Sequence, residues 1–216
     1  EAVTRAAVLY VFRSLIDDEI PMNEGCLEPL KIIIPKGSIL SPQHPAAVVA
    51  GNVETSQCVT DCIYGAVGAL AASQGTMNNF TFGNDHIQYY ETICGGAGAG
   101  PGFDGCDAVH THMTNSRMTD PEVLEQKFPV ILESFSIRQG SGGKGKWIGG
   151  AGVTRKIRFT DSVDASILSN HRRIAPFGID GGKNGGKGYN MIQRSNGKKE
   201  HLKGTATIHL EPGDTV

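Results

Sequence analysis

Side chains that can bind and protonate a small polar molecule are crowded between Gln74 and Glu122. Asparagines there offer hydrogen-bond donors and acceptors, tyrosines offer phenols, and an arginine can clamp a carboxylate through two parallel hydrogen bonds. Glycines between them let the backbone approach a ligand closely, as the stabilisation of an oxyanion requires. The candidate catalytic residues are Asn78, Asn79, His110, His112 and Asn115, and the candidate substrate-binding residues are Tyr90, Glu91, Gly96, Gly98 and Arg117.

Two of these residues, His110 and His112, are suited to moving a proton. They alternate within the run 108–113, whose pattern is typical of a strand, so both rings are expected on one face. We predict that this face, together with Asn115, lies near Asn78–Asn79 and looks into a polar cavity walled by Gly95–Gly100. A neutral imidazole there can shuttle a proton to or from a bound substrate.

The same histidines have a metal-binding alternative, because His-x-His is a recurring ligand spacing. No third ligand is identifiable, and hydrogen-bonding histidines are more common. Cys58 and Cys62 lie four apart on a predicted helix without a second pair, so buried free thiols are the better interpretation. We therefore predict no metal site on this segment.

Two glycine- and lysine-rich stretches, 140–147 and 181–188, contain the GxxxxGK core of a phosphate-binding loop. Both lack the Ser or Thr that binds magnesium, and neither leads into a helical pattern. Gly100–Gly105 fits GxGxxG but precedes a predicted strand instead of opening a helix. Turns between strands explain all three stretches better than a nucleotide site does.

The bulk composition restricts the partners and the compartment. A formal net charge of −2 provides no basic field for nucleic acid or for an anionic membrane surface. No apolar run approaches the roughly 20 residues that span a bilayer, and no signal-peptide pattern is present. The cysteines are odd in number, five, and lack framework spacing, which favours a reducing, cytoplasmic location.

The elements that must position these residues change character along the chain. A period of 3.6 residues predicts a helix within 1–20 and a central buried helix over 54–73, and Asp120-Pro begins a short third helix. Alternating or apolar runs predict strands elsewhere. The predicted strands are 30–34, 80–82, 87–93, 108–113, 130–138, 152–159, 165–170, 189–194 and 205–210.

These elements predict an α+β fold, in which the buried helix packs on a largely antiparallel, β-rich C-terminal part. We expect one body, 1–216, with a mixed α/β portion at 1–125 that carries the site and a β-rich portion at 126–216. The chain begins inside an amphipathic run at Glu1 and stops in an expected β-hairpin near Val216. We therefore expect an internal segment of a larger enzyme, inactive by itself.

Several strings of this sequence, in order along nearly the whole chain, resemble the hydantoinase B family. That family includes the C-terminal half of ATP-dependent 5-oxoprolinase and the α subunit of acetone carboxylase. The strings are Gly51–Gln57, Ala72–Asn79, Tyr89–Ile93, His110–Asn115, Thr119–Glu125, Arg138–Gly143, Gly149–Arg155 and Pro212–Asp214.

The resemblance implies a reaction and a partner. In such enzymes a hydantoinase A-type ATP-binding subunit or domain activates a cyclic amide or a carbonyl by phosphorylation, and the hydantoinase B-type unit completes the reaction. It implies ATP and magnesium on the partner unit, a lactam or hydantoin substrate, an oligomeric enzyme, and neither nucleic acid nor membrane as partner. The expected reaction is ATP-dependent hydrolysis of 5-oxoproline or a hydantoin ring.

Two alternatives remain open. The parent enzyme is a ketone carboxylase, or this segment is a structural and docking module without catalytic residues of its own. The carboxylase-type subunit builds a metal site from a Gly-Gly-x-His-x-x-Asp segment, which residues 1–50 lack. A metal is then bound on a preceding segment, or not at all. The alternatives differ in whether residues such as Asn78, Tyr90 and His110 converge on one pocket.

Overall fold

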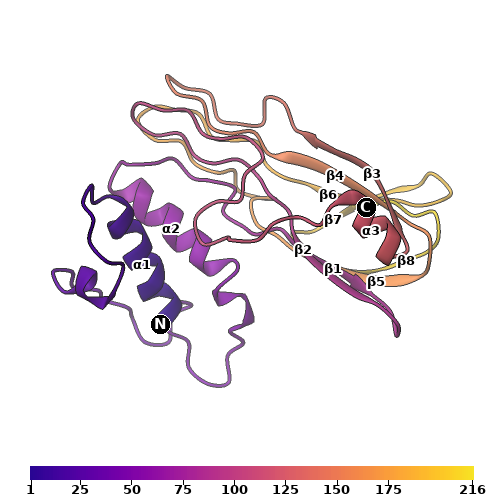
Figure 1. The fold of residues 1–216 in the computed structure, drawn as a ribbon, viewed down its shortest axis with the longest axis horizontal. Coiled ribbons are helices and arrows are strands. Elements are labelled where there is room, and N and C mark those ends of the chain that lie inside the picture. Colours follow the sequence, from indigo (N-terminus) through magenta and orange to yellow (C-terminus); the bar gives the residue numbers. More distant parts are fainter.

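The computed structural model describes residues 1–216, as a pair of helices beside a larger β-structure. Helices α1 (Ala2–Ser14) and α2 (Thr55–Ala66) pack against each other, on the left in Figure 1, and most strands lie on the right. The connection between them contains two 3-10 turns, η1 (Glu24–Leu27) and η2 (Val49–Gly51). None of the helices combines the length and the apolar character needed to cross a membrane.

Helix α2 buries a polar face, which differs from the prediction. Its buried residues are Ser56, Gln57, Thr60, Asp61 and Tyr64, whereas Cys62 and Ala66 are exposed. Most groups of the polar face have hydrogen-bond partners, although the Gln57 Oε1 and Thr60 Oγ1 atoms have none. The Gln57 side-chain amide, for example, donates to the Thr111 carbonyl at 3.1 Å. The cysteines are all free, as predicted, but Cys58 and Cys62 are exposed and not buried.

The helix is also shorter than predicted and has a different neighbour. It ends at Ala66 and not at residue 73, and Gly68 follows with φ 69°, a left-handed conformation that stops helices. Its main packing partner is α1, and not the sheet that we expected to cover it. Residues 67–78 form an irregular segment that leads away from the helix pair toward the strands.

The strands are antiparallel throughout, which confirms the α+β prediction. The largest sheet has the order β2 (Gln88–Thr92), β1 (Asn79–Gly83), β5 (Val163–Leu168), β8 (Thr205–Leu210). Strands β3 (Val130–Ile137) and β4 (Val153–Phe159) pair separately, as do β6 (Asn190–Gln193) and β7 (Lys199–Leu202). The first sheet joins strands from both halves of the chain. Strand β7 was not predicted, because its Lys-Glu-His sequence lacks an apolar alternation.

The hydrophobic core lies between the strands. Alternate residues of β1, Phe80 and Phe82, face it, and Ile157 and Phe159 face it from β4. The Phe82 and Phe159 rings meet edge to face, with their centroids 5.2 Å apart. Burying one such side chain contributes about 1.5–3 kcal/mol relative to leaving it in water, so these residues fix the relation of the two sheets.

Helix α3 (Pro121–Lys127) begins where the sequence predicts. The Asp120 carboxylate accepts hydrogen bonds from the Glu122 and Val123 backbone amides at 3.0 and 3.4 Å. Pro121 occupies the first helical position, where its missing N–H costs nothing. Local sequence alone therefore specifies this helix start.

Two predicted strands are absent. Residues 30–34 have no strand pairing, and Ile33 there is 75% exposed. In 108–113 only Val109 forms a bridge, to Gly95, and His112 lies in a turn with φ 52°. Alternation therefore does not place His110 and His112 on one face, because a left-handed residue reverses the chain direction.

Candidate functional site

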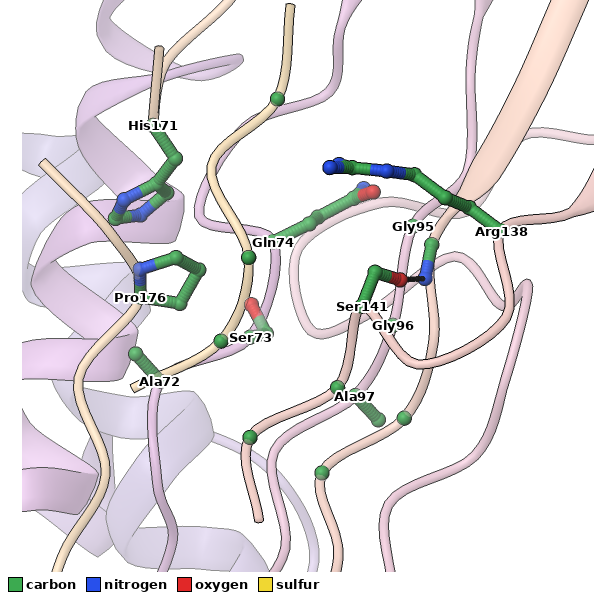
Figure 2. Close-up of a pocket in the computed structure, with 18 of the residues that line it drawn as sticks. Ala72, Ser73, Gln74, Gly95, Gly96, Ala97, Arg138, Ser141, His171 and Pro176 are labelled. Carbon is green, nitrogen blue, oxygen red and sulfur yellow. Dashed lines mark hydrogen bonds between the residues drawn. The ribbon is translucent and has the colours of Figure 1, made fainter. Parts of the chain in front are cut away.

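A cavity of about 470 Å³ opens where irregular loops from three parts of the chain meet (Figure 2). One wall is the segment around Ser73 and Gln74 with the Gly95–Gly100 loop. The second is the 138–154 connection with strand β4, and the third is the stretch 171–191. Apolar residues such as Phe80 and Ile157 close the end that faces the sheets. The volume is within the range of about 300–1,000 Å³ that small-molecule pockets occupy.

Gly96 and Gly98 belong to the cavity wall for a steric reason. A Cβ atom on Gly96 would lie 1.9 Å from the Gly150 carbonyl oxygen, and one on Gly98 would lie 1.9 Å from the Ala71 carbonyl oxygen. Both are far inside contact distance, so only glycine allows these backbones to approach. The predicted glycine loop thus lines the cavity, and these two positions hold its walls together.

The two stretches with a phosphate-loop core, 140–147 and 181–188, line the same cavity. Five of the eight backbone amides of 181–188 already donate to backbone carbonyls. Lys183 donates to the Lys144 carbonyl at 2.7 Å, and Gly186 donates to the Ser141 carbonyl at 2.7 Å. A phosphate loop needs a row of free amides that converge on the anion. The 181–188 stretch therefore does not fit a nucleotide phosphate, whereas in 140–147 only the Ser141 amide is engaged.

The cavity wall is strongly cationic. Its only carboxylate belongs to Asp180. One of the cations, Arg155, is neutralised within the protein, because the Glu91 carboxylate accepts two hydrogen bonds of 2.7 and 2.8 Å from its guanidinium. The cationic residues in the lining are Arg138, Lys144, Lys146, Arg155, Lys156, Arg172 and Lys183, and His171 accompanies them.

Arg172 is mostly buried, and its guanidinium contacts only neutral groups. It donates to the side-chain oxygens of Asn78 at 2.7 Å and Asn190 at 2.7 Å, and to the Asn170 carbonyl at 2.9 Å. Burial lowers the pKa of Arg172 to about 10, with Glu54 raising it and the charge of Arg138 lowering it further. The group remains a cation near neutral pH, without a carboxylate in ion-pair contact.

His171 presents a free imidazole nitrogen in its neutral form. Its Nδ1 lies 2.8 Å from the Ile174 carbonyl oxygen. A carbonyl only accepts, so Nδ1 carries the hydrogen and Nε2 keeps its lone pair. The residue lines the cavity, and its Nε2 atom lies against Gly75, where an added Cβ would meet it at 2.3 Å.

The predicted residues do not converge. Asn78, Gly96 and Gly98 line the cavity. Asn79 instead donates to the Glu54 carboxylate at 3.0 Å and accepts from the Tyr90 hydroxyl at 2.5 Å. Burial raises the pKa of Glu54, against hydrogen bonds that lower it. These three residues form a separate polar group outside the cavity lining.

His112 belongs to a second polar group, the Asp61 cluster, which we define as Asp61, Ser73, Thr111 and His112. The His112 Nε2 lies 3.3 Å from one Asp61 carboxylate oxygen. Ser73 donates to Asp61 from its backbone amide at 3.1 Å and from its hydroxyl at 3.2 Å. Only Ser73 also lines the cavity, so the cluster adjoins the cavity at this residue.

The other predicted residues lie apart from the cavity lining. Burial lowers the pKa of His110, and neither ring nitrogen has a hydrogen-bond partner in the protein. Asn115 and Arg117 are exposed. Glu91 is 4% exposed and is occupied by Arg155, whose guanidinium it holds at the cavity wall.

The structure adds four residues that the sequence reasoning missed: Gln74, Arg138, His171 and Arg172 line the cavity. One signal was available, because the polar run His171–Arg173 follows the predicted strand 165–170 directly. Loops at strand ends frequently carry binding residues. Nothing in the sequence indicated that this loop meets Arg138.

The fold and the cavity define an α+β module with a cationic, glycine-walled pocket of small-molecule size. The model of the hydantoinase B/oxoprolinase family matches residues 1–216. The chain belongs to this family, as its sequence motifs indicate.

Curated relatives cover the whole chain. It is 48% identical over 215 residues to a 5-oxoprolinase of Dictyostelium discoideum, and 52% identical over 216 residues to 5-oxoprolinase 1 of Arabidopsis thaliana. In both, all of this chain aligns, but to only 17% of the relative. The chain thus spans about a sixth of the length of these proteins.

Solved structures share the fold. An ATP-dependent caprolactamase from Pseudomonas jessenii matches 96% of this chain, and 40% of its own, with a TM-score of 0.79 and 21% identity. A nucleotide-free acetone carboxylase matches 68% of this chain, and 25% of its own, with a TM-score of 0.57 and 18% identity. At these identities the likeness concerns the fold alone.

Proposed function

We propose that the protein to which this segment belongs couples ATP hydrolysis to the opening of a cyclic amide, 5-oxoproline. The observation that carries the proposal is sequence identity near 50%, over the whole segment, to proteins named 5-oxoprolinase. The cationic cavity supports it, because 5-oxoproline is a small anion. The enzyme is proposed to be cytoplasmic and oligomeric.

In this proposal ATP and magnesium are bound by a hydantoinase A-type unit, fused or separate. The 181–188 loop of the cavity supports that division, because most of its amides already donate to backbone carbonyls. No group of three or more histidine, cysteine or acidic side chains is placed to hold a metal ion. The work of this segment is accordingly assigned to its own side chains.

Opening the ring by hydrolysis adds water across the amide bond. The water oxygen joins the carbonyl carbon, the C–N bond breaks, and the ring nitrogen receives a proton. We assign the acceptance of the water proton to His171, whose neutral Nε2 has a lone pair at the cavity wall. We assign the stabilisation of charge on the carbonyl oxygen to unpaired amides of the glycine loop, such as those of Gly96 and Gly98, with Asn78 beside them in the lining.

His110 and His112 remain proposed carriers of the proton to the ring nitrogen. His112 has a carboxylate partner in Asp61, an arrangement that orients an imidazole in many active sites. Replacing either histidine by alanine should lower the rate of ring opening and leave assembly with the ATP-binding unit intact. Unchanged turnover in both single variants would remove them from the mechanism and leave His171.

The test of the proposed function is a parallel assay of the full-length enzyme with its ATP-binding unit. ATP hydrolysis is measured with 5-oxoproline, with hydantoin, and with acetone plus bicarbonate. We expect ATP-dependent formation of glutamate from 5-oxoproline. Carboxylation of acetone without turnover of a lactam or hydantoin would replace this proposal with the carboxylase.

A second proposed role, docking, is supported by the connector between α1 and α2. Ile33, Ile39 and Val49 are 75%, 81% and 85% exposed, so their apolar surface has no cover within this segment. Such surface usually marks an interface. We propose that the connector packs on another part of the same protein. Hydrogen exchange of the full-length protein should then show protected amides at 30–50, and rapid exchange there would refute this role.

A further inference from the structure

Gln74 is buried at the cavity wall with its hydrogen bonds unmade. The residue is 9% exposed, and neither its side-chain oxygen nor its side-chain nitrogen has a partner in the protein. Figure 2 shows its carboxamide and the Arg138 guanidinium reaching toward each other across the cavity. Leaving a buried polar group unpaired is costly, so such groups need an explanation. A ligand between these side chains supplies one.

Two of the three arginines that line the cavity, Arg138 and Arg172, lack an anion. Arg138 donates to the Lys187 carbonyl at 2.8 Å and lies over the Tyr189 ring at 5.4 Å, and no carboxylate lies within ion-pair distance of it. Arg172 also donates only to neutral oxygens. Each charge destabilises the other, because the charge of Arg138 lowers the pKa of Arg172. A negative ligand removes this repulsion.

Arg155, in contrast, is a cation of the same wall that has a carboxylate partner within the protein. It lies close to the same cavity, and Glu91 neutralises it with two short hydrogen bonds. Arg138 and Arg172 have no such protein partner. The protein supplies a carboxylate to one arginine of the wall, and the other two are left for a carboxylate from outside.

The shape of the cavity favours a small organic anion over a nucleotide. Most amides of the 181–188 loop are engaged, so the side chains of the wall, above all its arginines, are the groups that this side of the cavity offers to an anion. Apolar residues such as Phe80, Ile157 and Met191 line the same cavity and suit the methylene groups of a saturated ring. A saturated ring with one carboxylate suits both the cationic and the apolar residues of the lining.

We propose that the cavity binds the carboxylate of the cyclic-amide substrate, with Arg138 and Arg172 as its cationic partners and Gln74 as a hydrogen-bonding partner. The inference rests on the proposed function and adds a selectivity to it. Lactams with a carboxylate beside the ring nitrogen are selected over neutral lactams of the same ring size. The specificity-determining residues therefore lie in this segment, away from the ATP-binding unit.

The experiment compares 5-oxoproline with its carboxamide, which has the same ring but no charge. KM and kcat are measured on the full-length enzyme with its ATP-binding unit, for the wild type and for Arg138→Gln. The matched control is Arg173→Gln, because Arg173 is exposed and does not line the cavity. We expect the wild type to prefer the carboxylate by about tenfold or more in KM, as a lost charge-assisted hydrogen bond implies.

In Arg138→Gln the KM for 5-oxoproline should rise by about tenfold while the KM for the carboxamide stays within about twofold, so the preference disappears. Arg173→Gln should keep the wild-type preference. A second variant, Gln74→Glu, places a carboxylate where the ligand's own is proposed to bind. It should raise the KM for 5-oxoproline and leave the melting temperature unchanged or higher, because the new carboxylate can pair with Arg138.

Three results would overturn the inference. The first is a wild type that does not distinguish the two lactams, and the second is equal KM changes for both lactams in Arg138→Gln. The third is a result with inorganic phosphate as the competing anion. If phosphate inhibits turnover of 5-oxoproline and of the carboxamide equally, and binds more weakly to Arg138→Gln, then the cavity binds a phosphoryl group and not the substrate carboxylate. If the wild type turns over no lactam, the proposed function fails as well. Turnover with unchanged KM values rejects the inference alone.

Discussion

The Asp61 cluster and the cavity adjoin at Ser73, but they differ in whether their polar groups have partners within the protein. In the cluster, the Asp61 carboxylate accepts two hydrogen bonds from Ser73 and lies 3.3 Å from the His112 Nε2 atom, which makes no hydrogen bond itself. In the cavity, Gln74 has no partner, and Arg138 has no anion. A saturated network stabilises the fold, whereas an unsaturated one costs stability that a ligand can restore. Density of polar residues alone does not tell the two apart.

This contrast also revises what the crowded stretch 74–122 signifies. Most of its candidate residues use their hydrogen bonds inside the protein, as Asn79 does with Glu54 and Tyr90. At the cavity, the unpaired carboxamide of Gln74 lies at one end of a wider range and the arginines without an anion, Arg138 and Arg172, at the other, whereas the unpaired His110 lies apart from the cavity lining. The predictions below test the difference between satisfied and unsatisfied polar groups.

The largest effect is expected on the chemistry at the cavity. Replacing His171 by Gln keeps a polar side chain but removes the basic nitrogen, so kcat for 5-oxoproline should fall by about 10²–10⁴-fold, with a smaller change in KM. Steady-state kinetics of the full-length enzyme measures both. Turnover within twofold of the wild type would remove His171 as the proton acceptor.

The next effect concerns the buried ion pair of Glu91 and Arg155. Their side chains are 2% and 4% exposed, so Glu91→Gln leaves a buried cation without its partner. The free energy of unfolding should fall by about 3–5 kcal/mol. The control is Glu133→Gln, which removes a comparable pair with Arg158 whose side chains are 37% and 39% exposed. That change should cost less than about 1 kcal/mol.

Thermal melting of the full-length protein separates these two variants. A melting temperature for Glu91→Gln equal to that of Glu133→Gln would contradict the assignment of Glu91 to stability and would return it to the substrate-binding residues.

A smaller effect compares Asp61 with Gln74 directly. Asp61→Asn weakens a satisfied network and should lower the free energy of unfolding by about 1–3 kcal/mol. Gln74→Met keeps the length of the side chain and removes the unpaired atoms, so stability should be unchanged or slightly higher. Chemical denaturation of the full-length variants makes the comparison. If Gln74→Met is the more damaging change, the carboxamide has a structural role and the contrast fails.

The smallest effect is a pH dependence that His110 causes. Burial holds the pKa of His110 below its unfolded value near 6.5, so on acidification the unfolded state binds a proton before the folded state does. Stability should therefore be complete above about pH 7 and decline as the pH falls through the unfolded pKa. His110→Gln should flatten the melting temperature between about pH 7.5 and 5.5. If the melting temperature of the variant changes with pH as steeply as that of the wild type, groups other than His110 cause the pH dependence.

The sequence by itself determined most of the regular structure, for a local reason. Strands such as Val163–Leu168 and Thr205–Leu210 alternate with period two because one face is buried, and the start of α3 is specified by Asp120 and Pro121. Those signals lie within a few residues of the structure they encode. The family motifs are likewise contiguous, which is why they indicated the class of protein before any fold was known.

Tertiary structure decided the site. Arg138 and His171 lie far apart in the chain and meet only because glycine-rich loops let the backbones approach. The left-handed turn at His112 removed it from the strand face that alternation predicted. Whether a polar group is satisfied depends on which distant atoms surround it. No local pattern records that, so the sequence listed the polar residues, and the packing of loops decided which were left unpaired to bind a ligand.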